Sequence, residues 1–179
     1  MINPILAAIA LVTSAPAAPD AGSMIVQLEC EGNRRGTGTR LSDETVVTAN
    51  HVLRTACSVA GVPVEVVRTY EDLDLAVLRV PAPQSGHWFQ TCSGAGFFEP
   101  YQAFGYAKGQ LRVVNLTSTG LRSKSGTIFE GTDTTIGGMS GGPVLDYLGR
   151  VAGIVLAHEI DGTRSMVRMF SDTPLCQGY

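Results

Sequence analysis

Short strand-like segments, separated by turn signals containing glycine or proline, recur along most of this 179-residue chain. Their spacing is typical of an all-β barrel or sandwich. No long stretch carries the 3.6-residue period of an amphipathic helix, and only residues 51–57 suit a helical turn. The sequence therefore predicts an all-β fold. The expected strands are residues 24–30, 36–41, 45–49, 62–69, 74–80, 101–107, 111–119, 127–131, 142–146, 149–158 and 164–170.

A stretch rich in proline and glycine divides these segments into two sets. Residues 81–86 read Pro-Ala-Pro-Gln-Ser-Gly, a composition that favours a linker over a strand. We therefore place an N-terminal unit at residues 23–80, a linker at 81–100 and a C-terminal unit at 101–179.

Residues 1–22 differ from the rest of the chain and predict a signal peptide. An apolar run over residues 5–12 precedes a small, Pro-rich segment with an Ala15-x-Ala17 cleavage site. The segment before the run lacks Lys and Arg, so a disordered cytoplasmic or phage-encoded leader stays an alternative. The run is shorter than the ~20 residues that cross a bilayer. We expect a secreted or periplasmic protein without a membrane span.

Composition excludes several classes of function. The chain is 44% hydrophobic and 16% charged, with a net charge of −3, and it has no basic run. Nucleic-acid binding therefore has no electrostatic basis. The sequence contains neither a phosphate-binding glycine loop with lysine nor clustered acidic ligands. Its four cysteines lack the C-x-x-C spacing of zinc sites. We expect no cofactor and no metal.

The strongest chemical signal is Gly137-Gly138-Met139-Ser140-Gly141-Gly142-Pro143-Val144. A glycine turn before Ser140 can direct the backbone N–H groups of Gly138 and Ser140 at one point. Two converging donors form an oxyanion hole, which stabilises the charge that develops during acyl transfer. A tight β-turn without chemistry is the alternative interpretation of this stretch.

A general base and its orienting acid occur upstream. His51 follows the strand-like run at residues 46–49 and so lies at a strand end. His87 lies in a loop, and His158 lies late in an apolar strand. Asp74 directly precedes the apolar segment 75–80, where a partly buried carboxylate needs a partner. Donation from the Nδ1–H of His51 would supply it and leave Nε2 free to accept the serine proton. Asp72 is the alternative acid.

These segments follow the order His…Asp…Ser, one of the known chain orders for this triad. Together they resemble the trypsin-like (chymotrypsin-fold) serine peptidases, in particular the small bacterial type related to HtrA and glutamyl endopeptidases. The matching motifs are Gly36-Thr37-Gly38-Thr39, Thr48-Ala49-Asn50-His51, Asp74-Leu75-Ala76-Val77-Leu78 and Gly138-Met139-Ser140-Gly141-Gly142-Pro143.

The resemblance implies two six-stranded antiparallel β-barrels with the active site between them. It also implies a serine endopeptidase that hydrolyses protein or peptide substrates through an acyl-enzyme, and we expect a monomer. In exported relatives a disulfide often closes the loop around the histidine. That pattern would join Cys30 to Cys57 and leave Cys92 for Cys176, although four cysteines allow three pairings.

Two departures from the family bear on activity. Met139 replaces the aspartate that digestive members pair with a newly cleaved N-terminus, so we expect a packed methionine and no activation cleavage beyond removal of the leader. Residues 154–158 lack the hydroxyl that many relatives direct at the triad carboxylate. The missing hydroxyl argues against full activity, and a catalytically weak or inactive protease-like binding module stays the alternative function.

Substrate preference follows from positions relative to Ser140. The family places Thr134, Thr135 and Val155 around the pocket for the side chain before the cleaved bond. No carboxylate stands six residues before Ser140, where trypsin-type members place one. A neutral pocket predicts cleavage after small or medium apolar residues.

Overall fold

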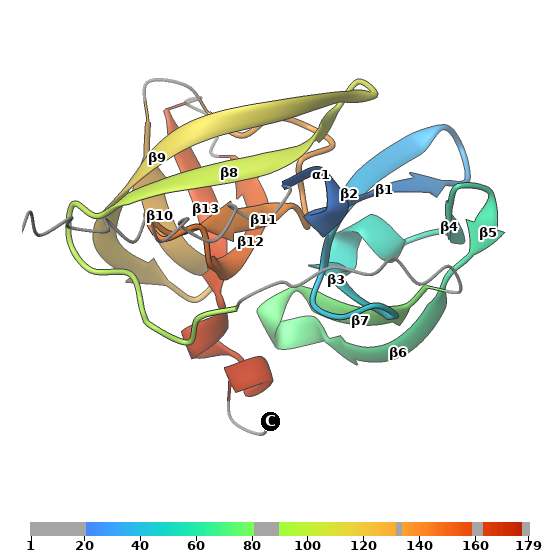
Figure 1. Ribbon diagram of the computed structural model, residues 1–179, viewed down its shortest axis with the longest axis horizontal. Helices are drawn as coiled ribbons and strands as arrows, with labels where there is room; N and C mark the ends of the chain where they lie inside the picture. Colours follow the sequence, from blue (N-terminus) through green and yellow to red (C-terminus); the bar gives the residue numbers. More distant parts are fainter. Residues whose placement is uncertain (1–20, 81–89, 132–133, 159–162, 177–179) are drawn as a thin grey trace, which may run out of the picture.

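The computed structural model describes residues 21–80, 90–131, 134–158 and 163–176, and strands dominate these ranges (Figure 1). The strands are β1 (Ile25–Cys30), β2 (Arg34–Arg40), β3 (Thr45–Ala49), β4 (Cys57–Val59), β5 (Val62–Pro63), β6 (Glu65–Tyr70), β7 (Leu75–Arg79), β8 (Pro100–Ala107), β9 (Gln110–Ser123), β10 (Gly126–Glu130), β11 (Pro143–Leu145), β12 (Val151–His158) and β13 (Arg164–Met169). The helical elements are α1 (Ala21–Met24) and the 3-10 turns η1 (Asn50–Leu53), η2 (Glu71–Leu73), η3 (Phe170–Asp172) and η4 (Pro174–Cys176). The expected leader lies almost wholly outside the described residues, as do residues 81–89 of the expected linker.

The N-terminal half is a seven-stranded antiparallel sheet in the order β5-β4-β1-β2-β3-β7-β6. Its interior strand β3 is β-branched apart from its terminal alanine, and all but its first residue are buried. A closed six-stranded barrel was expected here. The structure instead has an open sheet, because its edge strands β5 and β6 do not pair with each other. Strand β5 has two residues, and β6 faces solvent along almost its whole length.

The C-terminal half is a closed six-stranded barrel with the order β10-β13-β12-β11-β8-β9, as the resemblance implied. Strands β8 and β9 form a long hairpin that covers the upper side of the barrel in Figure 1. Side chains alternate between buried and exposed along the middle of β9, as expected for a sheet with one face on a core. The all-β, chymotrypsin-like fold class is confirmed.

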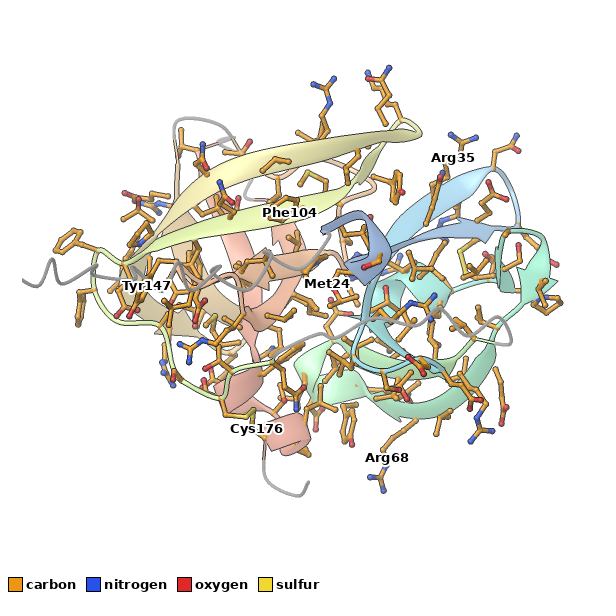
Figure 2. All side chains as sticks on the ribbon, in the orientation of Figure 1. Met24, Arg35, Arg68, Phe104, Tyr147 and Cys176 are labelled. Carbon is orange, nitrogen blue, oxygen red and sulfur yellow. A yellow bond between two sulfur atoms is a disulfide. The ribbon has the colours of Figure 1, made fainter. Side chains whose placement is uncertain are left out.

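The described residues form two apolar cores. The first includes side chains from both halves and so stabilises their junction, whereas the second lies within the C-terminal barrel. Met24 and Phe104 lie where the halves meet (Figure 2). Buried residues of the first core include Leu28, Val46, Val47, Leu75, Leu78, Ile154, Leu156 and Phe170. Those of the second include Tyr101, Val114, Phe129, Met139, Val144, Val155, Val167 and Met169.

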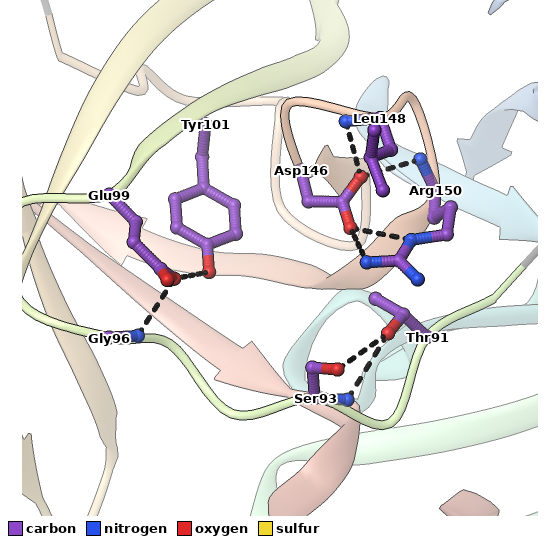
Figure 3. A network of polar contacts seen from close by, with 8 residues as sticks. All are labelled: Thr91, Ser93, Gly96, Glu99, Tyr101, Asp146, Leu148 and Arg150. Atoms are coloured by element: carbon purple, nitrogen blue, oxygen red, sulfur yellow. Dashed lines mark hydrogen bonds and ion pairs between the residues drawn. The ribbon is translucent and has the colours of Figure 1, made fainter.

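A polar network fixes the turn that leads into β12. The carboxylate of Asp146 accepts hydrogen bonds from the backbone N–H groups of Leu148 and Arg150, each at 2.9 Å (Figure 3). It also pairs with the Arg150 guanidinium at 2.7 Å. Beside this turn, the N–H of Thr91 donates to the Val151 carbonyl at the start of β12. The strand that reaches the candidate site is therefore anchored at its beginning.

Both expected disulfides are present. Cys30 bonds to Cys57 across strands β1 and β4, and Cys92 bonds to Cys176. The second bridge ties the chain that follows the linker to the C-terminal turn η4, near the lower edge of the molecule in Figure 2. Disulfides of this kind are typical of oxidising compartments. Among the described helices, none has the length and apolar character needed to cross a membrane.

Candidate active site

His51 is presented by the 3-10 turn η1, which begins directly after β3. The next residue, Val52, is buried and packs against Gly36 of β2, where an added Cβ would overlap the valine side chain. Because Val52 anchors the turn in the core, His51 keeps a third of its side chain exposed (33%). The imidazole is thus fixed in place and accessible.

Asp74 engages His51 through both carboxylate oxygens. His51 Nδ1 lies 2.7 Å from Oδ2, and the backbone N–H of His51 donates to Oδ1 at 2.9 Å. Asp74 follows η2 in a left-handed conformation (φ 50°), which aspartate tolerates better than most residues. The carbonyl of Asp74 accepts from the N–H of Asn50, the residue before His51, so a backbone hydrogen bond also joins the two segments. Asp72, the alternative acid, lies exposed on η2.

The electrostatics of this pair favour a charged carboxylate. Partial burial raises the pKa of Asp74, but the hydrogen bonds from His51 and the positive charges of His51 and Arg168 outweigh burial. The pKa of Asp74 is therefore held below its ordinary value. A carboxylate that is ionised at neutral pH and accepts from Nδ1–H fixes the tautomer in which Nε2 carries the lone pair.

Ser140 sits on the loop between β10 and β11, clamped by backbone hydrogen bonds on both sides. The N–H of Thr37 donates to the Ser140 carbonyl at 2.9 Å, and the N–H of Gly141 donates to the Val155 carbonyl at 2.7 Å. The Ser140 hydroxyl donates to the carbonyl of Leu156 at 2.9 Å. Within the described residues it makes no hydrogen bond to His51, which is common for such hydroxyls before substrate binds.

The glycine turn before Ser140 has the geometry of a type II β-turn. The N–H of Met139 donates to the Ile136 carbonyl at 3.0 Å, and Gly138 at the third position has φ 99°. A Cβ at Gly138 would lie 2.5 Å from the Tyr106 carbonyl, so both conformation and space require glycine. Within the described residues, the N–H groups of Gly138 and Ser140 donate to no protein acceptor. Two free donors thus flank the serine.

A buried threonine braces this turn from the other half of the molecule. The hydroxyl of Thr37 on β2 donates to the Gly138 carbonyl at 2.7 Å and accepts from the Tyr106 N–H at 2.8 Å. Its own carbonyl accepts from the hydroxyl of Thr48. One residue pair further along β2, Thr39 donates to the Gly141 carbonyl at 2.8 Å. The loop around Ser140 is therefore held by hydroxyls on β2 at both ends.

A cleft of about 530 Å³ opens beside this arrangement. It is lined by His51 and Asp74 from the first half and by Leu156 from β12, the residue whose carbonyl accepts from Ser140. Its other lining residues are Arg54, Glu71, Asp72, Lys124, Ser125, Ala157, Met166 and Arg168. The cleft thus lies between the halves, next to the imidazole and to the strand whose carbonyl accepts from Ser140. No group of three potential metal ligands occurs in the described ranges.

Comparison with known families decides the class. The profile of the trypsin-like peptidase domain matches residues 36–154, well over half of the chain, including the segments of His51, Asp74 and Ser140. The chain belongs to the trypsin-like peptidase family. A search of curated protein sequences found no significant match.

Solved structures support the same fold at low sequence identity. This trypsin-like peptidase is similar to the active form of the Rv3671c protease from M. tuberculosis (TM-score 0.72, 20% identity, 94% of this chain and 91% of the other). It is also similar to Deg5 (TM-score 0.65, 20% identity, 81% and 83% covered). A third match is the HtrA-type protease AlgW with a tripeptide (TM-score 0.68, 16% identity, 84% and 60% covered). At these identities the likeness concerns the fold.

Met139 has the packing role expected from the sequence. Its side chain is fully buried in the core of the C-terminal barrel, against Gly105 of β8. An added Cβ at Gly105 would come within 2.9 Å of the Met139 Cβ, which shows how closely the two segments approach. In this trypsin-like peptidase, the residue before the serine is thus anchored by apolar contact, with no ion pair needed to hold it.

The residues expected at the specificity pocket are more deeply buried than the sequence suggested. Thr135 is 1% exposed, and its hydroxyl and N–H both contact the hydroxyl of Ser165. Val155 is buried in the barrel core, with its backbone bonded to the serine loop. Thr134 is half-buried. Their contact with substrate stays a prediction.

Sequence reasoning missed three residues with evident roles in the site. Thr37 belongs to the motif Gly36-Thr37-Gly38-Thr39, in which a threonine between two strand glycines signals close backbone approach. Ser165 fills the space beside Thr135 and carries no local signal. Arg168 contributes charge and hydrogen bonds to the segment before Asp74, and an arginine inside the apolar run 164–170 could have indicated a buried cation.

Proposed function

We propose that the protein is a serine endopeptidase in which Ser140 is the nucleophile, His51 the general base and Asp74 the orienting acid. The observation that carries the proposal is the double contact between Asp74 and His51, at 2.7 and 2.9 Å, beside the cleft that both residues line. Leu156 lines the same cleft, and its carbonyl accepts the hydrogen bond of the Ser140 hydroxyl. Membership in the trypsin-like peptidase family supports the same assignment.

The proposed mechanism begins with a change of partner for the Ser140 hydroxyl. Rotation about its Cα–Cβ bond takes Oγ from the Leu156 carbonyl toward His51 Nε2, which accepts the proton as Oγ attacks the peptide carbonyl. The negatively charged oxygen that forms accepts hydrogen bonds from the free N–H groups of Gly138 and Ser140. His51 then donates its proton to the leaving amine, and water releases the acyl group by the reverse sequence.

The state of the turn is central to this proposal. In the Ile136–Met139 turn, a flip of the peptide before Gly138 would withdraw one of the two donors. Thr37 opposes that motion because it grips the adjacent Gly138 carbonyl, while buried Met139 anchors the far side. We therefore infer that the oxyanion site is formed before substrate arrives and requires no activating cleavage beyond removal of a leader.

For substrate preference, we propose cleavage after small or medium apolar residues. Thr134, Thr135 and Val155 offer no charge, and the Thr135 hydroxyl is already engaged by Ser165. Peptides varied only at the residue before the cleaved bond test this assignment. Strong cleavage after Arg or Glu would overturn the preference while leaving the mechanism intact.

The setting we propose is a monomer secreted or in the periplasm, acting on protein or peptide chains. Its two disulfides support an oxidising compartment. Fractionation of the native host should place the protein outside the cytoplasm, and recovery of reduced protein from the cytoplasm would contradict this.

One observation favours a second candidate, a protease-like binding module with weak or no activity. The Ser140 hydroxyl is occupied by the Leu156 carbonyl, and Leu156 offers no hydroxyl to Asp74. Labelling with a fluorophosphonate, followed by peptide mapping, separates the two functions. We expect one adduct on Ser140 and none in Ser140→Ala. A folded wild-type protein that resists the probe and cleaves no peptide would favour the binding module.

A further inference from the structure

A buried arginine joins the two halves directly behind Asp74. Arg168 lies on β13 of the C-terminal barrel, pairs with Ile154 of β12, and is only 5% exposed. Burying a guanidinium is costly unless its donors are satisfied. The guanidinium lies between the barrel and η2 of the other half, and its contacts there must satisfy these donors.

The guanidinium of Arg168 is held by carbonyl groups. Its Nε donates to the Leu73 carbonyl at 2.9 Å, and one terminal nitrogen donates to the carbonyls of Ser125 (2.9 Å) and Lys124 (3.4 Å). Within the described residues it forms no ion pair at contact distance. Its positive charge therefore acts on more distant carboxylates, which are Asp172 and Asp74.

The Leu73 contact bears directly on Asp74, because that carbonyl belongs to the peptide unit between the two residues. The N–H of the same peptide unit donates to the Glu71 carbonyl at 3.0 Å. The peptide plane between Leu73 and Asp74 is thus held by hydrogen bonds on both its carbonyl and its N–H edge. Asp74 itself has φ 50°, so its side-chain direction depends on keeping that plane fixed.

The carboxylate of Asp74 has few partners of its own. Among the described residues, its only hydrogen-bond donors are the two N–H groups of His51. Leu156, which borders the same cleft, has no hydroxyl to add. Arg168 is buried beside this half-buried carboxylate, and its positive charge acts on it without a direct contact.

We propose that Arg168 is a positioning residue for the Asp74–His51 pair, acting from the opposite half of the molecule by fixing the Leu73–Asp74 peptide and by placing a positive charge behind the carboxylate. This inference rests on the proposed peptidase function for its kinetic consequences. Its structural consequence, the behaviour of Asp74, holds whether or not the protein cleaves peptides.

Two substitutions separate the contributions of charge and geometry. Arg168→Met removes both the charge and the donors at similar side-chain length. Arg168→Lys keeps the charge but places all its donors on one nitrogen atom, whereas Arg168 contacts the three carbonyls from two nitrogens of a planar fork. Arg79→Met is the matched control, since Arg79 lies on β7 after Asp74 and forms an exposed ion pair with Glu65. Urea unfolding identifies which variants remain folded.

The kinetic expectation is a loss in turnover. For a fluorogenic peptide, kcat should fall about 10–100-fold in Arg168→Met, the range typical when a group that orients a functional side chain is removed. KM should change less than about threefold, because Arg168 stabilises the reacting groups more than it binds substrate. Arg168→Lys should recover part of kcat, and Arg79→Met should match the wild type.

The second readout is the carboxyl titration of Asp74, followed by carbon NMR in the Ser140→Ala background. Arg168 contributes to the lowered pKa of Asp74, so Arg168→Met should shift this titration to higher pH and Arg168→Lys should leave it near that of the parent. The other charged groups around the cleft, Arg54, Glu71, Asp72 and Lys124, are exposed and unchanged in every variant.

The outcomes distinguish this inference from the proposed function. A folded Arg168→Met variant with wild-type kcat would overturn the inference, as would an Asp74 titration that ignores the substitution. If Arg168→Met does not fold, an unperturbed kcat in Arg168→Lys overturns the geometric part. A wild-type protein without peptidase activity defeats the proposed function alone, because the Asp74 titration still tests Arg168.

Discussion

Replacement of Thr37 by valine tests whether the oxyanion turn is held from the neighbouring half. Valine has nearly the shape of threonine but lacks the hydroxyl, so the fully buried site stays filled. The substitution removes the hydrogen bond to the Gly138 carbonyl and the one from the Tyr106 N–H. Thr37→Ser keeps the hydroxyl and removes only a methyl group.

The expected loss of stability follows from these two bonds. Each contributes about 1 kcal/mol net, and leaving the half-buried Tyr106 N–H without this partner adds about 1–2 kcal/mol. Because Gly138 is half-buried, water can partly satisfy its carbonyl. The sum is about 3–4 kcal/mol, which is less than the stability of a typical domain, roughly 5–15 kcal/mol, so the variant should fold.

The expected loss of activity is smaller than complete loss of an oxyanion donor, which costs about 10²–10³-fold in kcat. If the freed turn weakens transition-state binding by about 1–2 kcal/mol, kcat falls roughly 5–30-fold. Hydrolysis of a fluorogenic peptide and the rate of fluorophosphonate labelling measure this directly. Thr37→Ser should stay within about threefold of the wild type in kcat.

Thr119→Val provides the matched control, because the Thr119 hydroxyl donates to the Ile128 carbonyl at 2.7 Å on the barrel wall. That variant should lose stability and keep its kcat. If Thr37→Val loses several kcal/mol and still turns over substrate at the wild-type rate, the turn is rigid without Thr37 and the reasoning fails.

Three further changes should each have a defined effect. Gly138→Ala should lower kcat at least about 100-fold, because the added Cβ disrupts the donor turn; near-normal turnover would reject the oxyanion assignment. The hydrogen bonds from His51 lower the pKa of Asp74, so its charged form stabilises the fold above about pH 4 and that contribution is lost as pH falls through the lowered pKa. Urea unfolding should therefore show a gap between wild type and Asp74→Asn that narrows between pH 7 and pH 3, and a widening gap would reverse the sign. Removal of the Cys30–Cys57 bridge, which spans 27 residues, should lower the free energy of unfolding by about 3–4 kcal/mol. Unchanged thermal unfolding would show that the loop is ordered without the bridge and would contradict this prediction.

The fold could be predicted largely from the sequence because its strands carry strong local signals. β3 was expected at residues 45–49 and occurs there, and β7 and β13 differ by one residue at their ends. β4 was missed, since Cys57–Val59 lies in a segment whose pairing with β1 depends on contacts distant in sequence. The open ladder of the first half was likewise beyond local patterns, because closure depends on how far two edge strands approach.

In the candidate site, too, some features follow from local sequence and others depend on contacts between distant segments. The choice of Asp74 over Asp72 followed from the apolar strand after it, and the structure brings Asp74 to His51. The partner of the Ser140 hydroxyl could not be anticipated, because a hydroxyl rotamer depends on the nearest acceptor in space. The contribution of Arg168 comes from β13, 94 positions after Asp74 in the chain, and only the docking of the two halves reveals it.

The central claim is that the Ser140 oxygen attacks a carbonyl whose negative charge then meets the N–H groups of Gly138 and Ser140. The most direct test is a crystal structure of the wild-type protein after reaction with a peptidyl phosphonate. We expect phosphorus bonded to Ser140 Oγ, one phosphonyl oxygen within about 3 Å of both N–H groups, and His51 Nε2 beside the adduct. A phosphonate attached to another residue, or a phosphonyl oxygen pointing away from both donors, would contradict the account.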